Sequence, residues 1–387
     1  MDINEVKLYT VGDAKKVSTW SNIPYFLAKS LENRNIRVYY VNIAPPLYLS
    51  ILYDCIVTRF IRLFYKNTQY NFFRSFLYDW YVKFKIYDSD KKYTSTKISI
   101  FLTYNSPVRS KKGISVLLCD WSFQYFLEKR LNKQVDFFEQ RAIKRENQNI
   151  SKSSLVVSLF PLCASYISDN NPIANIKHLA TNVVNDFNES KLSKDSLLKL
   201  KRKRRSLLFI GRSHYLSGAL LLIKEFVKIR NRKPDLILNI IGLNREDIKD
   251  EGEFEGIFFH GFLRKEILDE CNLYYKLISE ASIIINPTQK WGGYSSIIEA
   301  MYYYTPVITT PYDEFVEEFG NTINFGIYYN CNEQLSKIIL RILEQSDENY
   351  LKMCVNSHLQ VRDHTWQNYT DRLLKEINSC KLWNYQL

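Results

Sequence analysis

Short apolar runs alternate with amphipathic, helix-like stretches along most of the chain. An apolar run at residues 7–11 is followed by a helical pattern at 24–31 and by a second apolar run at 38–43. Runs of this length, rich in β-branched and aromatic residues, are typical of buried strands, and their alternation with helices is typical of βαβ units. We therefore expect the chain to open as a doubly wound α/β domain.

The alternation continues to the end of the chain. Further strands are expected at 98–102, 115–119, 154–159, 207–210, 236–242 and 283–285. Because 387 residues exceed what one ordinary core accommodates, we expect two domains of Rossmann size. Their predicted extents are residues 1–187 and 206–363.

Residues 188–205 are polar and strongly basic and contain no apolar strand. We interpret them as the linker between the two domains. A nucleic-acid-binding patch is the alternative, but no DNA- or RNA-binding fold signature accompanies the run, so no nucleic-acid partner is expected.

The clearest candidate site follows the run at 283–285. That run stops at Asn286-Pro287, Gly292 and Gly293 allow a tight turn, and a helical pattern then begins at Tyr294. A strand, glycine turn and helix leave the first backbone N–H groups of the helix unpaired at the positive end of its dipole, where they can hold a phosphate. An ordinary packing turn of an α/β domain is the alternative.

Polar residues around this turn extend the candidate site. Lys290 precedes the glycines, Ser295 and Ser296 lie at the start of the helix, and Glu299 lies about one and a half turns inside it. The carboxylate of Glu299 is close enough to the helix start to accept hydrogen bonds from a ribose diol.

Two further candidates follow predicted strands. The strand at 207–210 ends in Gly211-Arg212, and a guanidinium there suits a diphosphate, with a surface salt bridge as the alternative. Asp120 follows the strand at 115–119, at the edge where open α/β sheets bind ligands. It could bind an acceptor, or it could be the N-cap of the helix expected near Gln124.

Residues 47–85 are rich in both aromatic and basic side chains. The pattern is helical, and two interpretations remain open. A basic, aromatic helix can lie on an anionic membrane surface, or these helices can pack on the first sheet with their lysines and arginines in water.

Composition limits the classes of partner, the use of cysteine and the location that we expect for the chain. The formal charge of +12 favours anionic partners, and the 28 tyrosines and 23 phenylalanines suit stacking on sugars or bases as well as packing in a core. Seven scattered cysteines show neither a disulfide nor a zinc pattern. No apolar run approaches the roughly 20 residues that span a bilayer, and residues 1–7 lack a secretory signal, so we expect a cytoplasmic chain.

The order of residues around Glu299 resembles the donor-binding segment of retaining GT-B glycosyltransferases of family 4. In that family a glutamate, Gly-x-Gly, a second glutamate, Ala-Met and Pro-Val-Ile follow one another. Glu299 matches the second glutamate, Ala300-Met301 and Pro306 to Ile308 follow, and Trp291 occupies the place of the first glutamate.

The resemblance extends over nearly the whole chain. Thr19-Trp20-Ser21 resembles a Trp-Ser loop of one branch of the family, with Asn22 where that branch has glycine. Asp120-x-Ser-Phe matches a motif of the same branch, and Gly261-Phe262 matches a segment whose backbone meets the nucleotide base. Ser217 stands where the family has a lysine on the diphosphate, and Asn182 and Asp186 match the exit from the first domain only approximately.

The resemblance implies a GT-B fold, in which two doubly wound Rossmann-like domains face a cleft and a C-terminal helix, here 364–380, returns to the first domain. The implied function is the retaining transfer of a hexose from a nucleotide sugar to a hydroxyl of a glycan or lipid-linked glycan, in bacterial surface polysaccharide or lipopolysaccharide synthesis. It implies no metal or cofactor and no protein nucleophile. In it Arg212 and the helix start neutralise the diphosphate, Glu299 holds the ribose, and Thr19, Trp20, Ser21 and Asp120 contact the acceptor or the donor phosphate.

Two other classes of function remain open. Because Trp291 and Ser217 replace two donor-binding residues of the family, the chain could be an inactive glycosyltransferase-like binding protein. Its basic surface could also make it a peripheral membrane or nucleic-acid-binding protein.

Overall fold

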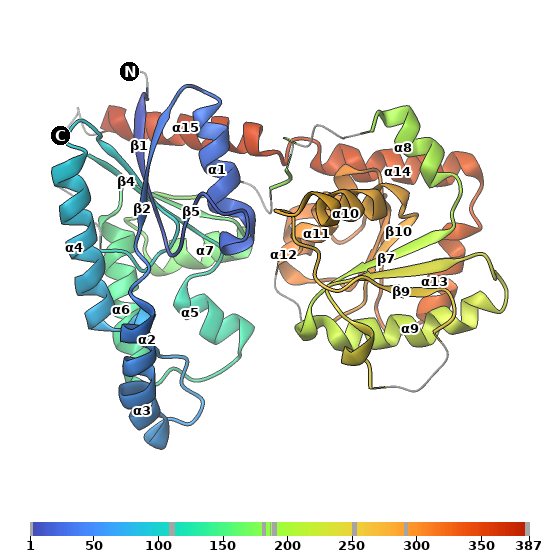
Figure 1. Ribbon diagram of the computed structural model, residues 1–387, viewed down its shortest axis with the longest axis horizontal. Coiled ribbons are helices and arrows are strands. Elements are labelled where there is room, and N and C mark those ends of the chain that lie inside the picture. Colours follow the sequence, from blue (N-terminus) through green and yellow to red (C-terminus); the bar gives the residue numbers. More distant parts are fainter. Residues whose placement is uncertain are drawn as a thin grey trace. The chain divides into compact units, whose positions relative to one another are not determined.

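Two parallel β-sheets organise the chain, one in each of two units (Figure 1). The first unit contains residues 1–181 and 367–387, and the second contains residues 182–366. The structure is a computed structural model that describes residues 3–107, 113–179, 183–185, 187, 192–249, 254–289 and 293–383.

The sheet of the first unit has the strand order β2-β1-β3-β4-β5-β6, and every strand pair in it is parallel. In the register, Leu8 lies opposite Tyr40 on one side and Ile100 on the other. The strands are β1 (Glu5–Thr10), β2 (Arg37–Asn42), β3 (Ile98–Phe101), β4 (Ile114–Cys119), β5 (Leu155–Ser158) and β6 (Ile176–His178).

Helices connect these strands, except between β3 and β4, where no helix is found among the described residues. Two of the longer ones begin at capping side chains: Ser75 caps α4, and Asp136 with Glu139 forms a capping box at α6. The helical segments are η1 (Thr19–Asn22), α1 (Ile23–Glu32), α2 (Leu47–Tyr53), η2 (Asp54–Thr58), α3 (Arg59–Phe64), η3 (Phe72–Arg74), α4 (Phe76–Lys92), α5 (Phe123–Tyr125), η4 (Phe126–Arg130), α6 (Phe137–Lys152), α7 (Pro161–Asn170) and α15 (Trp366–Trp383).

The sheet of the second unit has the order β12-β11-β10-β7-β8-β9, again with parallel pairs throughout. Its central strand β10 is buried along its whole length, as expected of a parallel sheet with helices on both faces. The strands are β7 (Ser206–Ile210), β8 (Ile237–Ile241), β9 (Ile257–Phe259), β10 (Ile283–Asn286), β11 (Val307–Thr309) and β12 (Gly326–Tyr328).

The helices of the second unit alternate with its strands. They are α8 (Lys194–Lys201), η5 (Ser213–Tyr215), α9 (Leu216–Arg230), η6 (Arg245–Asp247), α10 (Leu268–Glu280), α11 (Ser295–Tyr302), α12 (Asp313–Phe319), α13 (Leu335–Leu343) and α14 (Asp347–Val361). The predicted α/β fold with two doubly wound parallel sheets is confirmed.

Part of the basic run that we expected to link the two domains is helical. Residues 188–191 lie outside the described residues, but 194–201 form helix α8 of the second unit instead of a solvated connection. Lys201 is fully buried, and the guanidinium of Arg204 bonds to Leu343 O and Asp347. Part of the basic run is therefore structural, because distant backbone and carboxylate oxygens accept its hydrogen bonds.

The last helix, α15, belongs to the first unit although the second unit precedes it in sequence. Arg34 Nε donates to Asp371 Oδ1 at 2.6 Å, and another nitrogen of this guanidinium donates to Gln367 O at 2.6 Å. Leu373 and Ile377 are fully buried. Among the residues that the structure describes, no helix is long and apolar enough to span a bilayer.

Candidate functional site

The strand order of the second sheet reverses between β7 and β10, and the candidate residues follow these two strands. Gly211 and Arg212 come directly after β7, and the turn with Gly293 leads from β10 to α11. In open α/β sheets, ligands bind at such a reversal, beyond the carboxyl ends of the strands. The topology therefore brings both motifs to one edge of the sheet.

Arg212 is exposed at this edge and stacks on an aromatic ring. Its guanidinium carbon lies 4.2 Å from the centre of the Phe262 ring, and that ring is half exposed. Arg212 has no acidic partner among the residues that the structure describes, so the structure gives no support to a surface salt bridge. The cation is thus held in place while its N–H groups face solvent.

Two glycines allow this packing. Gly261, before Phe262, has φ +59°, and a Cβ there would lie 2.6 Å from Asn244 Oδ1. At Gly211 a Cβ would lie 2.7 Å from the Tyr215 Cβ. Tyr215 in turn lies close to the turn before α11, because its hydroxyl is 3.4 Å from Gly293 O. The loop that carries Arg212 and the turn at Gly293 are therefore neighbours.

Helix α11 begins without a capping side chain among the described residues. Its N-cap position is Tyr294, whose side chain is fully buried beside Tyr312 and Phe315, so only the backbone of Tyr294 remains available to a ligand. Ser295 is exposed and Ser296 is half-buried. The first N–H groups of a helix have no intrahelical acceptor, so this end suits an anion.

Glu299 lies at the centre of a polar cluster that the sequence did not reveal. Lys265 Nζ donates to Oε1 at 2.9 Å and to Oε2 at 2.8 Å, the Tyr274 hydroxyl donates to Oε2 at 2.7 Å, and the Tyr275 hydroxyl donates to Oε1 at 3.2 Å. A carboxylate accepts about four hydrogen bonds. All of the ordinary acceptor positions of Glu299 are therefore taken.

The three donors differ in burial and in the elements that carry them. Tyr274 and Tyr275 are buried on helix α10, and burial together with the Glu299 charge raises the pKa of Tyr274 well above its ordinary value, so both hydroxyls stay protonated. Lys265 comes from the loop between β9 and α10 and its ammonium lies 4.2 Å above the Tyr274 ring. No motif or periodicity pointed to these three residues, because they meet Glu299 only through tertiary packing.

In the first unit, Thr19, Trp20 and Ser21 form a strained turn after β1. Trp20, Ser21 and Asn22 have φ values of 36°, 54° and 73°, which L-residues rarely adopt. Asn tolerates this conformation better than most residues, so Asn22 can replace the glycine of the resembling loop. Thr19 Oγ1 fixes the turn by donating to Asp13 O at 2.6 Å.

Asp120 follows β4 at the same edge of the first sheet, since all strands are parallel. It is not the N-cap of the following helix: Ser122 is, and its Oγ accepts from Tyr125 N at 3.2 Å. The carboxylate of Asp120 accepts instead from Trp121 N at 2.9 Å and from Cys119 Sγ at 3.1 Å, both through Oδ1.

Several expected residues lie outside the described residues. These are Lys290 and Gly292 of the glycine turn, Trp291 at the place of the first family glutamate, and Asn182 and Asp186 near the exit from the first unit.

His260 has a structural position. Its Nε2 lies 2.8 Å from Asn239 Oδ1, and burial lowers its pKa. Within the described ranges, no group of three or more His, Cys, Asp or Glu side chains is placed to hold a metal ion.

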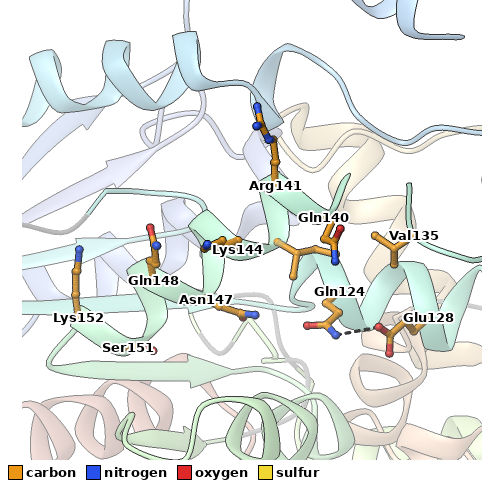
Figure 2. Close-up of a pocket in the computed structure, with 11 residues that line it drawn as sticks. Gln124, Glu128, Val135, Gln140, Arg141, Lys144, Asn147, Gln148, Ser151 and Lys152 are labelled. Carbon is orange, nitrogen blue, oxygen red and sulfur yellow. Dashed lines mark hydrogen bonds between the residues drawn. The ribbon is translucent and has the colours of Figure 1, made fainter. Parts of the chain in front are cut away.

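A separate polar groove runs along α6 in the first unit (Figure 2). Its volume is about 830 Å³, and the Gln124 amide donates to Glu128 Oε1 at 2.9 Å beside it. None of the expected site residues lines the groove. The lining residues are Gln124, Glu128, Val135, Gln140, Arg141, Ile143, Lys144, Asn147, Gln148, Ser151 and Lys152.

Comparisons with known proteins agree with this architecture. Residues 204–345 match the family described as Glycosyl transferases group 1, which supports a function in glycosyl transfer. A comparison with curated protein sequences finds no match.

Solved glycosyltransferase structures are similar over most of the chain. Sucrose-phosphate synthase from Thermosynechococcus elongatus is 14% identical with a TM-score of 0.64, over 97% of this chain and 98% of that one. HepE from Anabaena, solved with UDP and glucose, is 13% identical with a TM-score of 0.61, over 98% and 100%. The chain thus has the GT-B fold.

A third structure is similar over a shorter part of its length. TarM from S. aureus, solved with UDP and alpha-GlcNAc-glycerol, is 15% identical with a TM-score of 0.55 over 77% of this chain. The chain spans 59% of the length of that protein.

Proposed function

We propose that the chain transfers a hexose from a nucleotide-sugar donor to a hydroxyl of a glycan acceptor, with retention at the anomeric carbon. The observation that carries the proposal is the arrangement at the reversal of the second sheet. There the exposed guanidinium of Arg212 and the loop before Phe262 lie beside the turn that begins α11. This edge offers a fixed cation and free helix-end N–H groups to a single anionic group.

The proposed chemistry is stabilisation of the leaving group. As the glycosidic bond breaks, charge builds on the diphosphate, and donors that are already in place stabilise it without reorganisation. Gly211 lets the loop pack against Tyr215, Arg212 pairs with the phosphates, and the N–H groups of Ser295 and Ser296 support them. We propose that these groups suffice without a bound metal.

The remaining candidates have supporting roles in the proposal. The backbone at Gly261 and Phe262 would meet the base, and Glu299 would hold the ribose. Asp120 and the turn at Thr19, Trp20 and Ser21 would meet the acceptor or the donor phosphate.

A panel of nucleotide sugars tests this function directly. One member should raise the melting temperature of the protein and be turned over in the presence of EDTA, and NMR of the product should show the donor's anomeric configuration. Binding of a nucleoside diphosphate without any turnover would favour the alternative of an inactive binding protein, which the residues at Ser217 and Trp291 suggest. No stabilisation by any member of the panel would contradict the proposal.

We further propose a place in bacterial surface polysaccharide or lipopolysaccharide synthesis, with a lipid-linked glycan as acceptor. The reaction would then occur at the inner face of the cytoplasmic membrane, with the protein bound peripherally. Exposed apolar and basic side chains of the first unit support this location.

A further inference from the structure

The helices α2, η2 and α3 form a continuous arm of the first unit, residues Leu47–Phe64 (Figure 1). Many of its large apolar side chains are exposed. Leu47, Leu63 and Phe64 are 73%, 71% and 69% exposed. More than half of the exposed large hydrophobic residues in the described chain lie between residues 47 and 87. A concentration of this kind marks an interaction surface.

The exposed side of the arm is not its packing side. Ile61 is 3% exposed and belongs to an apolar cluster with Tyr70, Phe123 and Leu127, against which Tyr53 also packs. The arm is therefore apolar on two sides, only one of which the first unit covers. A helix with that pattern is expected to have a second apolar neighbour.

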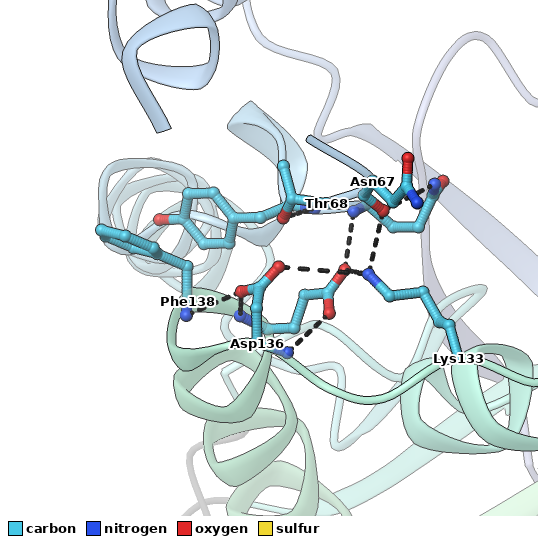
Figure 3. Close-up of polar contacts among 8 residues, drawn as sticks. Asn67, Thr68, Lys133, Asp136 and Phe138 are labelled. Atoms are coloured by element: carbon cyan, nitrogen blue, oxygen red, sulfur yellow. Dashed lines mark hydrogen bonds and ion pairs between the residues drawn. The ribbon is translucent and has the colours of Figure 1, made fainter. Parts of the chain in front are cut away.

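A buried ionic network holds the segment that follows the arm in place (Figure 3). The Glu139 carboxylate, fully buried, accepts from Gln69 N at 2.6 Å and from Lys133 Nζ at 2.5 Å. Lys133 also donates to Asn67 O at 2.9 Å. The segment after α3 is thereby tied to the start of α6, so the arm presents its outer side in a fixed orientation.

Helix α4 adds a second exposed stripe. Phe76, Trp80, Phe84 and Tyr87 are exposed and recur at helical spacing, and Trp80 is 63% exposed. The Tyr81 hydroxyl donates to Ala44 O at 3.0 Å and so ties α4 to the segment before the arm.

Unpaired positive charges lie beside the apolar residues of the arm. Arg59, Arg62 and Lys66 are exposed and have no ion-pair partner in the part of the chain that the structure describes. Of the nearby acids, Asp54 Oδ1 accepts from Thr58 and from Phe72 N, and Asp79 pairs with Lys83, whereas Asp88 on α4 is exposed.

Arg59 and Arg62 also line a hollow of about 460 Å³. Ile51 and Phe73 form apolar parts of its wall, and Ser50, Asp54 and Cys55 complete it. Two guanidinium groups beside apolar walls match a phosphate that is attached to hydrocarbon.

We propose that the outer sides of the arm and of α4 dock on a bilayer of anionic phospholipid, with a lipid phosphate between Arg59 and Arg62. The apolar side chains enter the boundary between headgroups and acyl chains, and the three cations meet the negative headgroups. A second copy of the chain fits less well, because a two-fold contact sets the same patch against itself and would bring unpaired cations together. The proposal gives the proposed transfer its location, but it depends on different residues.

Vesicle co-sedimentation tests the charge requirement. The protein should bind vesicles with about 30% phosphatidylglycerol at low salt much more strongly than vesicles of phosphatidylcholine alone, and binding should weaken as salt rises. The variant R59Q/R62Q/K66Q should bind roughly a hundredfold more weakly, since each cation near the surface contributes about a factor of five. The control K199Q/R202Q/K203Q removes the same charge from exposed positions of the second unit and should bind almost normally.

Insertion is tested separately. The variant L63S/F64S should lose binding at every salt concentration, and the blue shift of tryptophan fluorescence on vesicle binding should shrink in W80F. If the protein fails to bind phosphatidylglycerol vesicles at low salt, or if the K199Q/R202Q/K203Q control loses as much binding, the docking surface is wrong. Concentration-dependent self-association that L63S/F64S abolishes would assign the surface to a second copy instead.

The outcome can be separated from that of the proposed function. R59Q/R62Q/K66Q and L63S/F64S should bind nucleoside diphosphates and transfer sugar to a water-soluble acceptor like the unaltered protein. Loss of both vesicle binding and nucleoside diphosphate binding would indicate that these variants misfold, and their melting temperatures and circular dichroism spectra would show it. Misfolding would refute the assignment of these side chains to an outer surface.

Discussion

Glu299 has no spare acceptor position, and this limits how a ribose can bind to it. Tyr274 and Tyr275 are buried on a helix, whereas Lys265 comes from a loop and its side chain is 17% exposed. A ribose diol that hydrogen-bonds to Glu299 must therefore displace the ammonium of Lys265. The displaced cation then remains near an anionic ligand at the same sheet edge.

We expect Lys265→Met to change nucleoside and nucleoside diphosphate binding in opposite directions. Without the competing ammonium, the affinity for the bare nucleoside should rise, while loss of the cation should weaken nucleoside diphosphate binding about tenfold, as for one charged contact of roughly 1.5 kcal/mol. Isothermal titration calorimetry with both ligands measures this difference.

Lys265→Arg is the matched control and should retain both affinities within a few-fold. Parallel changes of the two affinities in Lys265→Met would show that Lys265 does not exchange between Glu299 and the ligand.

Arg212 provides a second prediction at this scale. With Ser217 in place of the family's lysine, Arg212→Ala should lower the turnover rate by an amount on the order of 2–4 kcal/mol in barrier, because it stabilises charge that develops in the transition state. Steady-state kinetics separates this loss from a change in donor affinity. Ser217 is exposed, so Ser217→Lys in the Arg212→Ala background should recover part of the rate.

Lys224→Ala, which removes another exposed cation of the second unit, serves as the control and should leave turnover unchanged. Full turnover in Arg212→Ala would place the phosphate elsewhere.

The residues of the candidate site could be selected from the sequence only where a strand or a glycine turn lies next to them in the chain. Gly211, Arg212 and Glu299 follow strands or lie in a helix next to a glycine turn, so local pattern was enough to select them. Lys265 and Tyr274 meet Glu299 from separate elements, and no local pattern carries that contact. Asp120 was equally suited to capping and to binding until the structure showed Ser122 as the cap.

At the scale of elements, the basic run before β7 shows that a pattern of charges does not reveal which of its residues are buried. Lys201 is fully buried, and its Nζ lies 2.9 Å from Ile278 O, 2.7 Å from Ala281 O and 2.8 Å from Thr305 Oγ1. A run of charges is usually solvated, and the acceptors that bury this one lysine are distant in sequence. The pattern could therefore not distinguish Lys201 from its neighbours.

Burial lowers the pKa of Lys201 to about 7. A neutral amine still suits the site, since it can donate to two carbonyls and accept from a hydroxyl. In the unfolded chain the ordinary lysine pKa of about 10.4 returns, so between pH 7 and 10 the unfolded state binds more protons. The contribution of Lys201 to stability is therefore smallest below pH 7 and grows as the pH rises.

We expect the free energy of unfolding of the unaltered protein to rise relative to that of Lys201→Met by on the order of 2 kcal/mol between pH 6 and 9. Each unit of pKa difference corresponds to about 1.4 kcal/mol. Melting temperatures of the two proteins at a series of pH values measure it. Lys199→Met, at an exposed position of the same helix, should show no such slope. A constant difference between the unaltered protein and Lys201→Met across this range would mean that the buried group keeps its proton.

For the whole molecule, the alternation of apolar runs and helices was sufficient to predict two parallel sheets, because parallel strands need crossover helices. The exposed arm was not predictable in the same way. Phe60 and Ile61 are adjacent and both apolar, yet one is 61% exposed and the other 3%. Only the position of the neighbouring cluster determines which of them is covered.

The chain passes from the first unit to the second and returns through α15, so the first unit needs both parts of the sequence. Leu373, on α15, is fully buried in that unit. Leu373→Ala should lower the stability of the first unit by about 2–5 kcal/mol, the usual cost of such a cavity, and Leu373→Met should cost less than about 1.5 kcal/mol. Nucleoside diphosphate binding should remain, because the residues proposed to hold the donor diphosphate belong to the second unit with its own core.

Calorimetric unfolding with and without the nucleoside diphosphate checks both parts: the ligand should still raise the transition temperature of the second unit in Leu373→Ala. If the variant lowers both transitions equally, the two units unfold together, and the separate core assigned to the second unit does not suffice to keep it folded.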